Sequence, residues 1–163
     1  MRTLFLMVCA AALAAAAFSW TVTAPASVEA ARFEVAGDAA RGEWVFTAAG
    51  CASCHHAPDS DNELVLSGGQ AFPSDFGTFY APNISTDAEA GIGGWDAAQF
   101  ANAVLNGVSP RGRHYYPAFP YTSYTRMTDQ DVNDLWAYMH TLPADGTESR
   151  THDVGSPFNI RRS

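Results

Sequence analysis

The feature that most constrains this chain of 163 residues is the segment Cys51-Ala-Ser-Cys54-His55. Two thiols at this spacing can reach the two vinyl groups on one edge of a porphyrin and become thioethers, and the adjacent imidazole can bind the iron. The pattern is typical of the attachment site of a c-type haem. Because the motif occurs once, we predict one covalently bound haem c with His55 as an axial ligand.

The two thiols could instead form a redox pair or half of a zinc site. The third cysteine, Cys9, lies in an amino-terminal apolar run, so no second pair remains for a four-cysteine zinc site. No His-x3-5-His pattern follows to complete a mixed zinc site. A thioredoxin-like pair would follow a strand, whereas here a helical pattern precedes the motif. The haem interpretation is therefore favoured.

The first thirty residues indicate export. Arg2 provides a positive start, residues 4–18 are apolar, and small residues suitable for cleavage follow at Ala24-Pro-Ala26 or Val28-Glu-Ala30. A secretory signal has this pattern, but a run of ~20 residues of low polarity could also remain as a membrane anchor. Either case predicts a periplasmic protein, tethered to the membrane only if the segment is retained.

The rest of the chain suits a single domain. We expect residues 1–30 to be the signal or anchor, residues 31–145 the monohaem domain, and residues 146–163 a polar tail on the surface. Removal of residues 1–30 leaves the net charge at −8, and all nine basic residues of the chain are arginines. Nucleic acid is thus an unsuitable partner, and a redox partner steered by charge should be positive around its docking site.

Three stretches have the spacing of helices and open with residues that cap helices. They begin after Asp38, Asp96 and Thr128, and they end near Ala49, at Gly107 and before Pro143, respectively. Gln99 and Asp131 lie three residues after the second and third caps, as in a capping box. On the first helix, Trp44, Val45 and Ala48 are spaced to share one face.

Residues 56–95 lack a long periodic segment and are rich in glycine and proline. A loop this long is uncommon in a compact domain, but a porphyrin is a large apolar body on which loop side chains can be buried. We expect the following apolar residues to pack on the haem or on one another: Leu64, Leu66, Phe72, Phe76, Phe79 and Ile84.

The chain resembles the haem modules in the cytochrome c subunits of bacterial membrane-bound alcohol, gluconate and aldehyde dehydrogenases. The matching stretches are Arg41-Gly42, residues 76–84, 91–95 and 116–124, and the helix over residues 131–138. The resemblance implies an all-α, class I cytochrome c fold in which the first and last helices cross near the haem. It also implies transfer of single electrons between a dehydrogenase donor and a respiratory acceptor, such as a cytochrome or an oxidase. This chain departs from the family in having one module instead of three, and in Phe119 where several relatives have methionine.

The second axial ligand decides between two functions. We expect Met127, in the loop that opens the last helix, to bind the iron, whereas Met139 lies on an apolar stripe and should fill the core. His114 is the strongest competing ligand. Arg111 and Arg113 either pair with the haem propionates or remain solvated.

With a methionine ligand the protein would be an electron carrier and not an enzyme. Without a second ligand, the open iron would favour a haem enzyme or a sensor of small ligands. The residues leave both hypotheses open, and the electron carrier is favoured.

Overall fold

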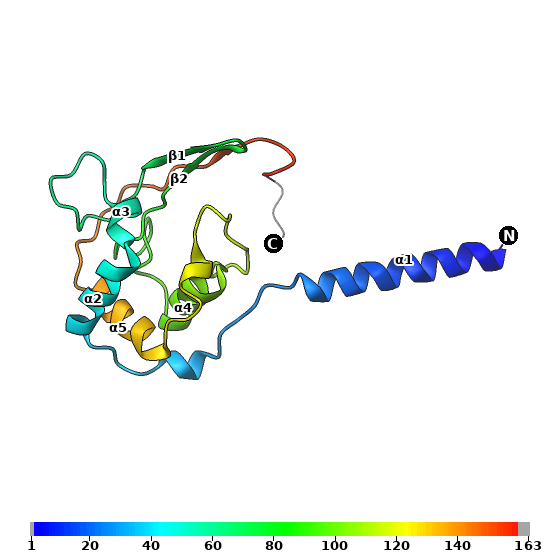
Figure 1. The fold of residues 1–163 in the computed structure, drawn as a ribbon, viewed down its shortest axis with the longest axis horizontal. Coiled ribbons are helices and arrows are strands. Elements are labelled where there is room, and N and C mark those ends of the chain that lie inside the picture. The colour runs from blue at the N-terminus through cyan, green and yellow to red at the C-terminus, as the bar shows by residue number, and fades with distance from the viewer. Residues whose placement is uncertain (1, 160–163) are drawn as a thin grey trace.

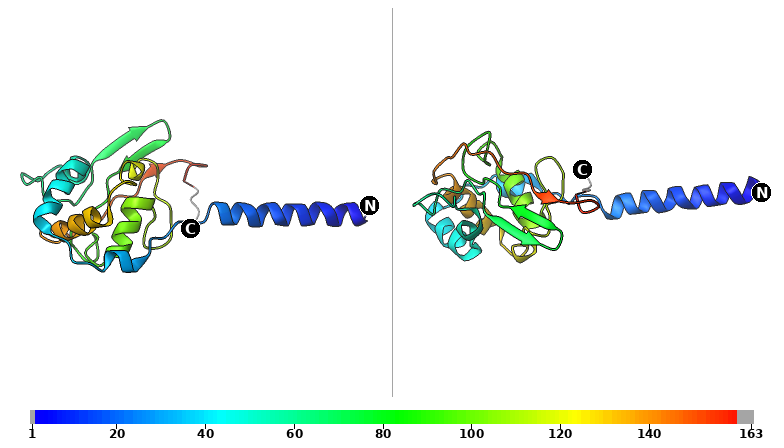
Figure 2. Two further views of the ribbon diagram at one scale, coloured as in Figure 1. Left: turned by 60° about the horizontal axis from the view of Figure 1, so that its bottom comes forward. Right: turned by 90° about the horizontal axis from the view of Figure 1, so that it is seen from above.

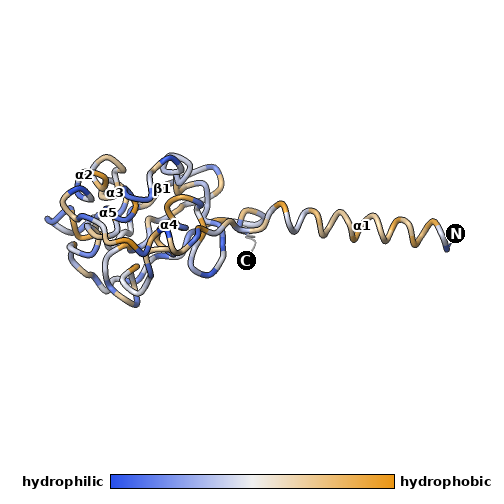
Figure 3. The backbone as a smooth tube through the Cα atoms, turned by 90° about the horizontal axis from the view of Figure 1, so that it is seen from below, coloured by the Kyte–Doolittle hydropathy of each residue, from blue (hydrophilic) through white to orange (hydrophobic). Residues whose placement is uncertain are grey.

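The computed structural model describes residues 2–159 (Figure 1). The amino-terminal helix α1, Arg2–Val22, stands away from the rest of the molecule in every view (Figures 1 and 2) and has no buried residue. It is mostly apolar along its length (Figure 3), and within residues 2–159 it is the one helix long and apolar enough to cross a membrane. A signal sequence has the same properties, so both predicted roles remain compatible with this helix.

The three predicted helices are present as α2 (Ala39–Ala49), α4 (Ala97–Asn106) and α5 (Asp129–Met139). Their caps are confirmed. The Asp38 carboxylate accepts hydrogen bonds from the backbone of α2, and α4 and α5 each begin with a complete capping box. Gly107 ends α4 in the left-handed conformation that glycine adopts without steric cost.

The last helix is shorter than its periodicity predicts. It ends at Met139, and the chain then tightens into two i to i+3 hydrogen bonds that end at Thr141 and Leu142. Pro143 disfavours helical geometry in the residue before it, which accounts for the early end. Leu142 is nevertheless buried, so its apolar role is as predicted.

Helices α2 and α5 cross in direct backbone contact at Gly42. A Cβ atom on Gly42 would lie 2.0 Å from the carbonyl oxygen of Asp134, so a larger residue cannot occupy this crossing. Phe46 is buried one turn further along α2, with its ring centroid 5.2 Å from that of Tyr138. Trp44, predicted to share a face with Val45 and Ala48, is 79% exposed and does not contribute to the core. Met139 is 1% exposed and fills the core as predicted.

The segment between α2 and α4 contains structure that the sequence did not indicate. A short helix, α3 (Cys51–His55), follows α2 directly, and a hairpin forms from β1 (Ala71–Ser74) and β2 (Gly77–Tyr80). A two-residue strand, β3 (Asp153–Val154), pairs antiparallel with β2. Two 3-10 turns, η1 (Ala30–Phe33) and η2 (Tyr121–Ser123), complete the elements. The structure is thus mostly helical with a small sheet, which is compatible with the class I cytochrome c fold.

The carboxyl-terminal segment lies along the surface and is held there by polar contacts. The buried side chain of Asn83 donates to the carbonyl oxygens of Asp145 and Thr147 at 2.7 and 2.8 Å. Further along, His152 accepts a hydrogen bond from the Tyr80 backbone through Nδ1 at 3.2 Å. Residues 160–163 of the predicted tail lie outside the described residues.

Candidate haem site

The residues of the predicted attachment motif all lie on the short helix α3. Gly50, in the left-handed conformation, ends α2 and begins α3, so the first thiol follows the end of α2 within two residues. Cys51 and Cys54 are partly buried and neither forms a disulfide. Burial raises the pKa of the Cys51 thiol to about 11, which keeps it protonated at neutral pH. Two free thiols one helical turn apart, followed by a histidine, are the groups of a c-type haem attachment site.

His55 is held in the orientation that a metal ligand needs. Its Nδ1 lies 2.9 Å from the carbonyl oxygen of Pro82, and a carbonyl can only accept, so Nδ1 carries the proton. Burial lowers the pKa of His55 and favours the neutral ring. Nε2 is therefore left as the basic nitrogen, and a bond of this kind to the other ring nitrogen is the usual support of a metal-bound histidine.

The neighbouring histidine is oriented differently. Nδ1 of His56 lies 2.9 Å from the carbonyl oxygen of Ala52, one turn back on its own helix. The chain beyond His56 is then tied to the motif by a hydrogen bond from the Gly68 backbone to the His55 carbonyl at 2.9 Å. The His55 ring is thus bonded to the loop that contains Pro82, whereas the His56 ring is bonded within its own helix.

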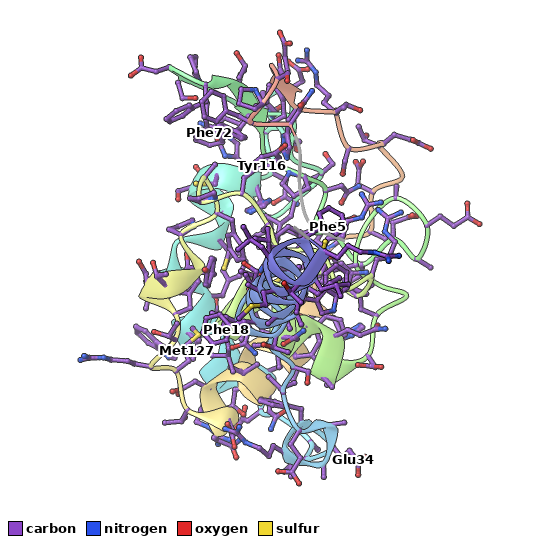
Figure 4. The ribbon with its side chains drawn as sticks, turned by 90° about the vertical axis from the view of Figure 1, so that its right-hand side faces the viewer. Phe5, Phe18, Glu34, Phe72, Tyr116 and Met127 are labelled. Carbon is purple, nitrogen blue, oxygen red and sulfur yellow. The ribbon has the colours of Figure 1, made fainter. Side chains whose placement is uncertain are left out.

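The loop that carries Met127 reaches the end of α2. A cavity of about 570 Å³ is lined by residues from α2, the η2 loop and the start of α5: Val45, Ala48, Ala49, Pro120, Ser123, Tyr124, Met127 and Asp131. Met127 is partly buried against the core and lies where the loop enters α5 (Figure 4). The structure therefore brings Met127 to the helix end that immediately precedes the cysteines.

The other predicted site residues lie on the preceding part of the same loop. His114 pairs with Val108 in an isolated antiparallel bridge. Arg111 and Arg113 are exposed, and neither forms an ion pair with any residue in the described part of the chain. Phe119 is surrounded by aromatic rings, with centroid distances of 5.7 Å to Tyr115 and 6.1 Å to Tyr124.

Of the apolar loop residues expected at the haem, Leu66 is fully buried, and Leu64 and Ile84 pack against the core. Phe76 is 52% exposed and contacts Phe158 instead, with ring centroids 4.8 Å apart. Phe76 therefore packs on a residue outside the predicted set, and its contact with the haem stays a prediction. Its position at the tip of the hairpin explains this, because the hairpin was not foreseen.

Two further residues contribute to the site besides the predicted ligands and propionate contacts. Pro82 contributes a backbone carbonyl, which side-chain chemistry cannot reveal, although it lies in one of the stretches that carry the family resemblance. Tyr124 donates a hydrogen bond from its hydroxyl to the carbonyl oxygen of Ala49 at 2.9 Å. Burial raises the pKa of Tyr124, and the nearby thiols of Cys51 and Cys54 raise it further, so this ring lies close to the attachment motif.

The structure provides no further ligands for the alternative zinc site within the described residues. Within residues 2–159, no group of three or more histidine, cysteine, aspartate or glutamate side chains is arranged to hold a metal ion. The donor set consists of two free thiols and one imidazole whose Nδ1 is bonded to Pro82, which fits a thioether-linked haem. Comparison with known families agrees, because a family model described as "Cytochrome c" matches residues 39–143. The chain belongs to the cytochrome c family.

Membership of the cytochrome c family implies a covalently bound haem c and an electron-transfer function, and the relatives agree with it. The chain is 54% identical over 127 residues to a diheme cytochrome c-type protein of Cereibacter sphaeroides, covering 77% of this chain and 43% of the relative. It is 38% identical to the fructose dehydrogenase cytochrome subunit of Gluconobacter japonicus, covering 76% and 25% of the two chains. It is 32% identical to the cytochrome c subunit of a quinone alcohol dehydrogenase of Gluconobacter oxydans, covering 74% and 25%. The chain thus spans less than half the length of each of these relatives.

Proposed function

We propose that this chain is an exported monohaem cytochrome c that carries single electrons from a dehydrogenase to a respiratory acceptor and transforms no substrate itself. The observation that carries the proposal is the geometry of His55, whose Nδ1 is bonded to Pro82 while Nε2 remains available beside two free thiols. When bound, the haem supplies a one-electron ferric/ferrous couple. The protein's part is to attach the group, fix its ligands and limit its exposure to water.

One haem is proposed because the attachment motif occurs once. The diheme relative does not oppose this number, since the chain covers 43% of its length. Intact mass of the purified protein counts the haem directly. Replacing Cys51 and Cys54 together by serine should remove the covalently bound haem, whereas Cys9→Ser, in α1, should leave it in place. A protein that retains one covalent haem after loss of both thiols would refute the attachment site.

His55 is proposed as the first axial ligand, and His56 offers a matched control. His55→Ala should abolish the low-spin spectrum of the reduced protein, whereas His56→Ala should preserve it, because the His56 ring is bonded within its own helix. Equal spectral loss in both variants would show that the change reflects folding rather than ligation.

Met127 is proposed as the second axial ligand, and Arg111 and Arg113 as residues that can reach the haem propionates. Met127→Ala should abolish the thioether-to-iron charge-transfer absorption of the ferric protein, and Met139→Leu should preserve it, since Met139 is a core residue. Carbon monoxide provides the second test. Rapid and complete binding by the ferrous wild-type protein at neutral pH would favour an open-site enzyme or sensor, and His114→Ala would show whether a histidine closes the site.

Export is proposed to remove α1 by cleavage after Ala26. Val28 packs against the core, and Phe33 in η1 is 3% exposed, so cleavage after Ala30 would remove a residue that the folded domain uses. The Ala24-Pro-Ala26 sequence provides the small residues that a signal peptidase requires. The exported protein should therefore begin at Ser27. An intact mass that includes α1 would instead establish a membrane anchor.

The donor is proposed to be a dehydrogenase because several relatives are the cytochrome subunits of such enzymes. The net charge of −8 predicts a positively charged docking site on the partner. Reduction by a candidate dehydrogenase should slow as ionic strength rises, and the rate should be independent of salt if charge does not steer the encounter.

A further inference from the structure

Tyr124 connects the loop that carries Met127 to the helix end that precedes the haem motif. Its hydroxyl donates to the carbonyl oxygen of Ala49 at 2.9 Å, and Ala49 is the last residue of α2. Cys51 follows two residues later. One side-chain hydrogen bond therefore joins two segments that are 75 residues apart in the sequence and that both line the cavity beside the haem motif.

The same residue also fixes the position of Met127. The Met127 backbone N–H donates to the carbonyl oxygen of Tyr124 at 2.9 Å, which closes a tight turn between the two residues. Both side chains line the cavity of about 570 Å³ together with Ala49. The backbone of Tyr124 is thus bonded to the Met127 turn, and its side chain is bonded to the end of α2.

Aromatic packing leaves the Tyr124 ring little freedom. Its ring centroid lies 6.1 Å from that of Phe119. Phe119 in turn contacts the rings of Tyr115 and Tyr121. Tyr121 packs so closely on the end of α4 that a Cβ atom on Gly107 would lie 2.4 Å from its ring. The loop is therefore braced against α4 at one end and bonded to α2 at the other.

From this geometry we propose that Tyr124 is a positioning residue for the second axial ligand: its hydroxyl bond to Ala49 holds the Met127 turn in place and thereby keeps external ligands from the iron. The inference rests on the proposed role of Met127. Its physical basis is that an external ligand must displace Met127, so any bond that stabilises the closed loop weakens external binding by the same factor.

The test is a titration of the ferric holoprotein with imidazole. Binding is measured by the loss of the thioether-to-iron absorption as imidazole displaces Met127. Tyr124→Phe removes the hydroxyl and keeps the ring. Tyr121→Phe is the matched control, because the Tyr121 hydroxyl makes no hydrogen bond within residues 2–159. Loss of one hydrogen bond of ordinary strength should tighten imidazole binding about fivefold in Tyr124→Phe and should leave Tyr121→Phe within twofold of wild type.

The outcomes separate this inference from the proposed function. If Met127→Ala loses the absorption band but Tyr124→Phe binds imidazole like the wild type, Tyr124 has no positioning role and the ligand assignment stands. If Met127→Ala keeps the band, both are refuted. A urea midpoint lowered in Tyr124→Phe with unchanged imidazole affinity would show a purely structural role and would also overturn the inference.

Discussion

The buried carboxylate of Asp134 should contribute a large share of the stability of the α2–α5 crossing. Its side chain is 3% exposed and accepts four hydrogen bonds, from the Asp38 backbone at 2.6 Å, from Nε and Nη2 of Arg41 at 2.8 and 3.1 Å, and from Gln130 at 2.7 Å. Asp134→Asn keeps the shape but replaces one acceptor oxygen by an amide group that faces donors. Breaking a buried, paired charge costs about 3–5 kcal/mol, and we expect about 3 because the Arg41 side chain is 59% exposed and can return to water.

Urea denaturation of the holoprotein, followed by circular dichroism, measures this loss. With a denaturant slope near 2 kcal/mol per molar, a loss of about 3 kcal/mol lowers the midpoint by about 1.5 M. Asp129→Asn is the control, because Asp129 pairs with Arg32 at an exposed site, where an ion pair contributes little. A midpoint change in Asp134→Asn no larger than that of the control at pH 7 would refute the reasoning.

The pH dependence provides a second check. The Arg41 hydrogen bond, opposed by burial and assisted by the Asp38 backbone and Gln130, holds the pKa of Asp134 below its ordinary value in the folded protein. A carboxylate whose pKa is lowered by folding contributes its full stabilisation when the pH is above its pKa in the unfolded chain, about 3.9. This contribution is lost as the pH falls through its pKa in the folded protein. The difference between wild type and Asp134→Asn should thus be constant above about pH 5 and should shrink below about pH 4. An equal difference at pH 3 and pH 7 would contradict it.

Two further substitutions test packing away from the site. Gly42→Ala should destabilise the protein by about 3 kcal/mol, because the new methyl group would force α2 from the Asp134 carbonyl, whereas Trp44→Ala, exposed on the same helix, should change the urea midpoint little. A tolerated Gly42→Ala would mean that the helices can separate freely. Asn83→Ala should cost about 2 kcal/mol and speed proteolysis within residues 144–159, because it removes two hydrogen bonds to carbonyl groups of that segment, of which the Asp145 carbonyl keeps only the Ser85 hydroxyl as a donor; unchanged cleavage would show that other contacts hold it.

The sequence was sufficient for those parts of the fold that depend on local interactions. A cap and its partner lie within one helical turn, so Asp38, Asp96 and Thr128 could each be assigned before the structure was known. The attachment motif is also local. Its spacing alone identifies the two thiols and the imidazole, although the short helix α3 that carries them was not predicted.

The features that were missed depend on distant partners. The β1–β2 hairpin lies in a glycine- and proline-rich segment, and β3, which pairs with β2, comes from the carboxyl-terminal segment. The face of α2 that contacts α5 was not identified from the sequence for a related reason. Periodicity grouped Trp44 with Val45 and Ala48 on one face, but the close approach of α5 selects the smallest residue, Gly42, for the contact. The size of residue that fits where two helices cross depends on the partner helix. The periodicity of one helix therefore cannot reveal it.

The candidate site depends both on a local motif and on contacts with distant segments, and the distant contacts bear on its function. His55 is fixed by a carbonyl from residue 82, and the Met127 turn is fixed through a carbonyl at the end of α2, so backbone atoms hold both proposed ligands from separate segments. Backbone acceptors anchored in packed elements move little, so the ligand geometry should change little between the two oxidation states. A site that binds gases or peroxide needs a ligand that leaves readily, whereas an electron carrier benefits from one that stays. The double anchoring therefore favours electron transfer over ligand exchange for this chain.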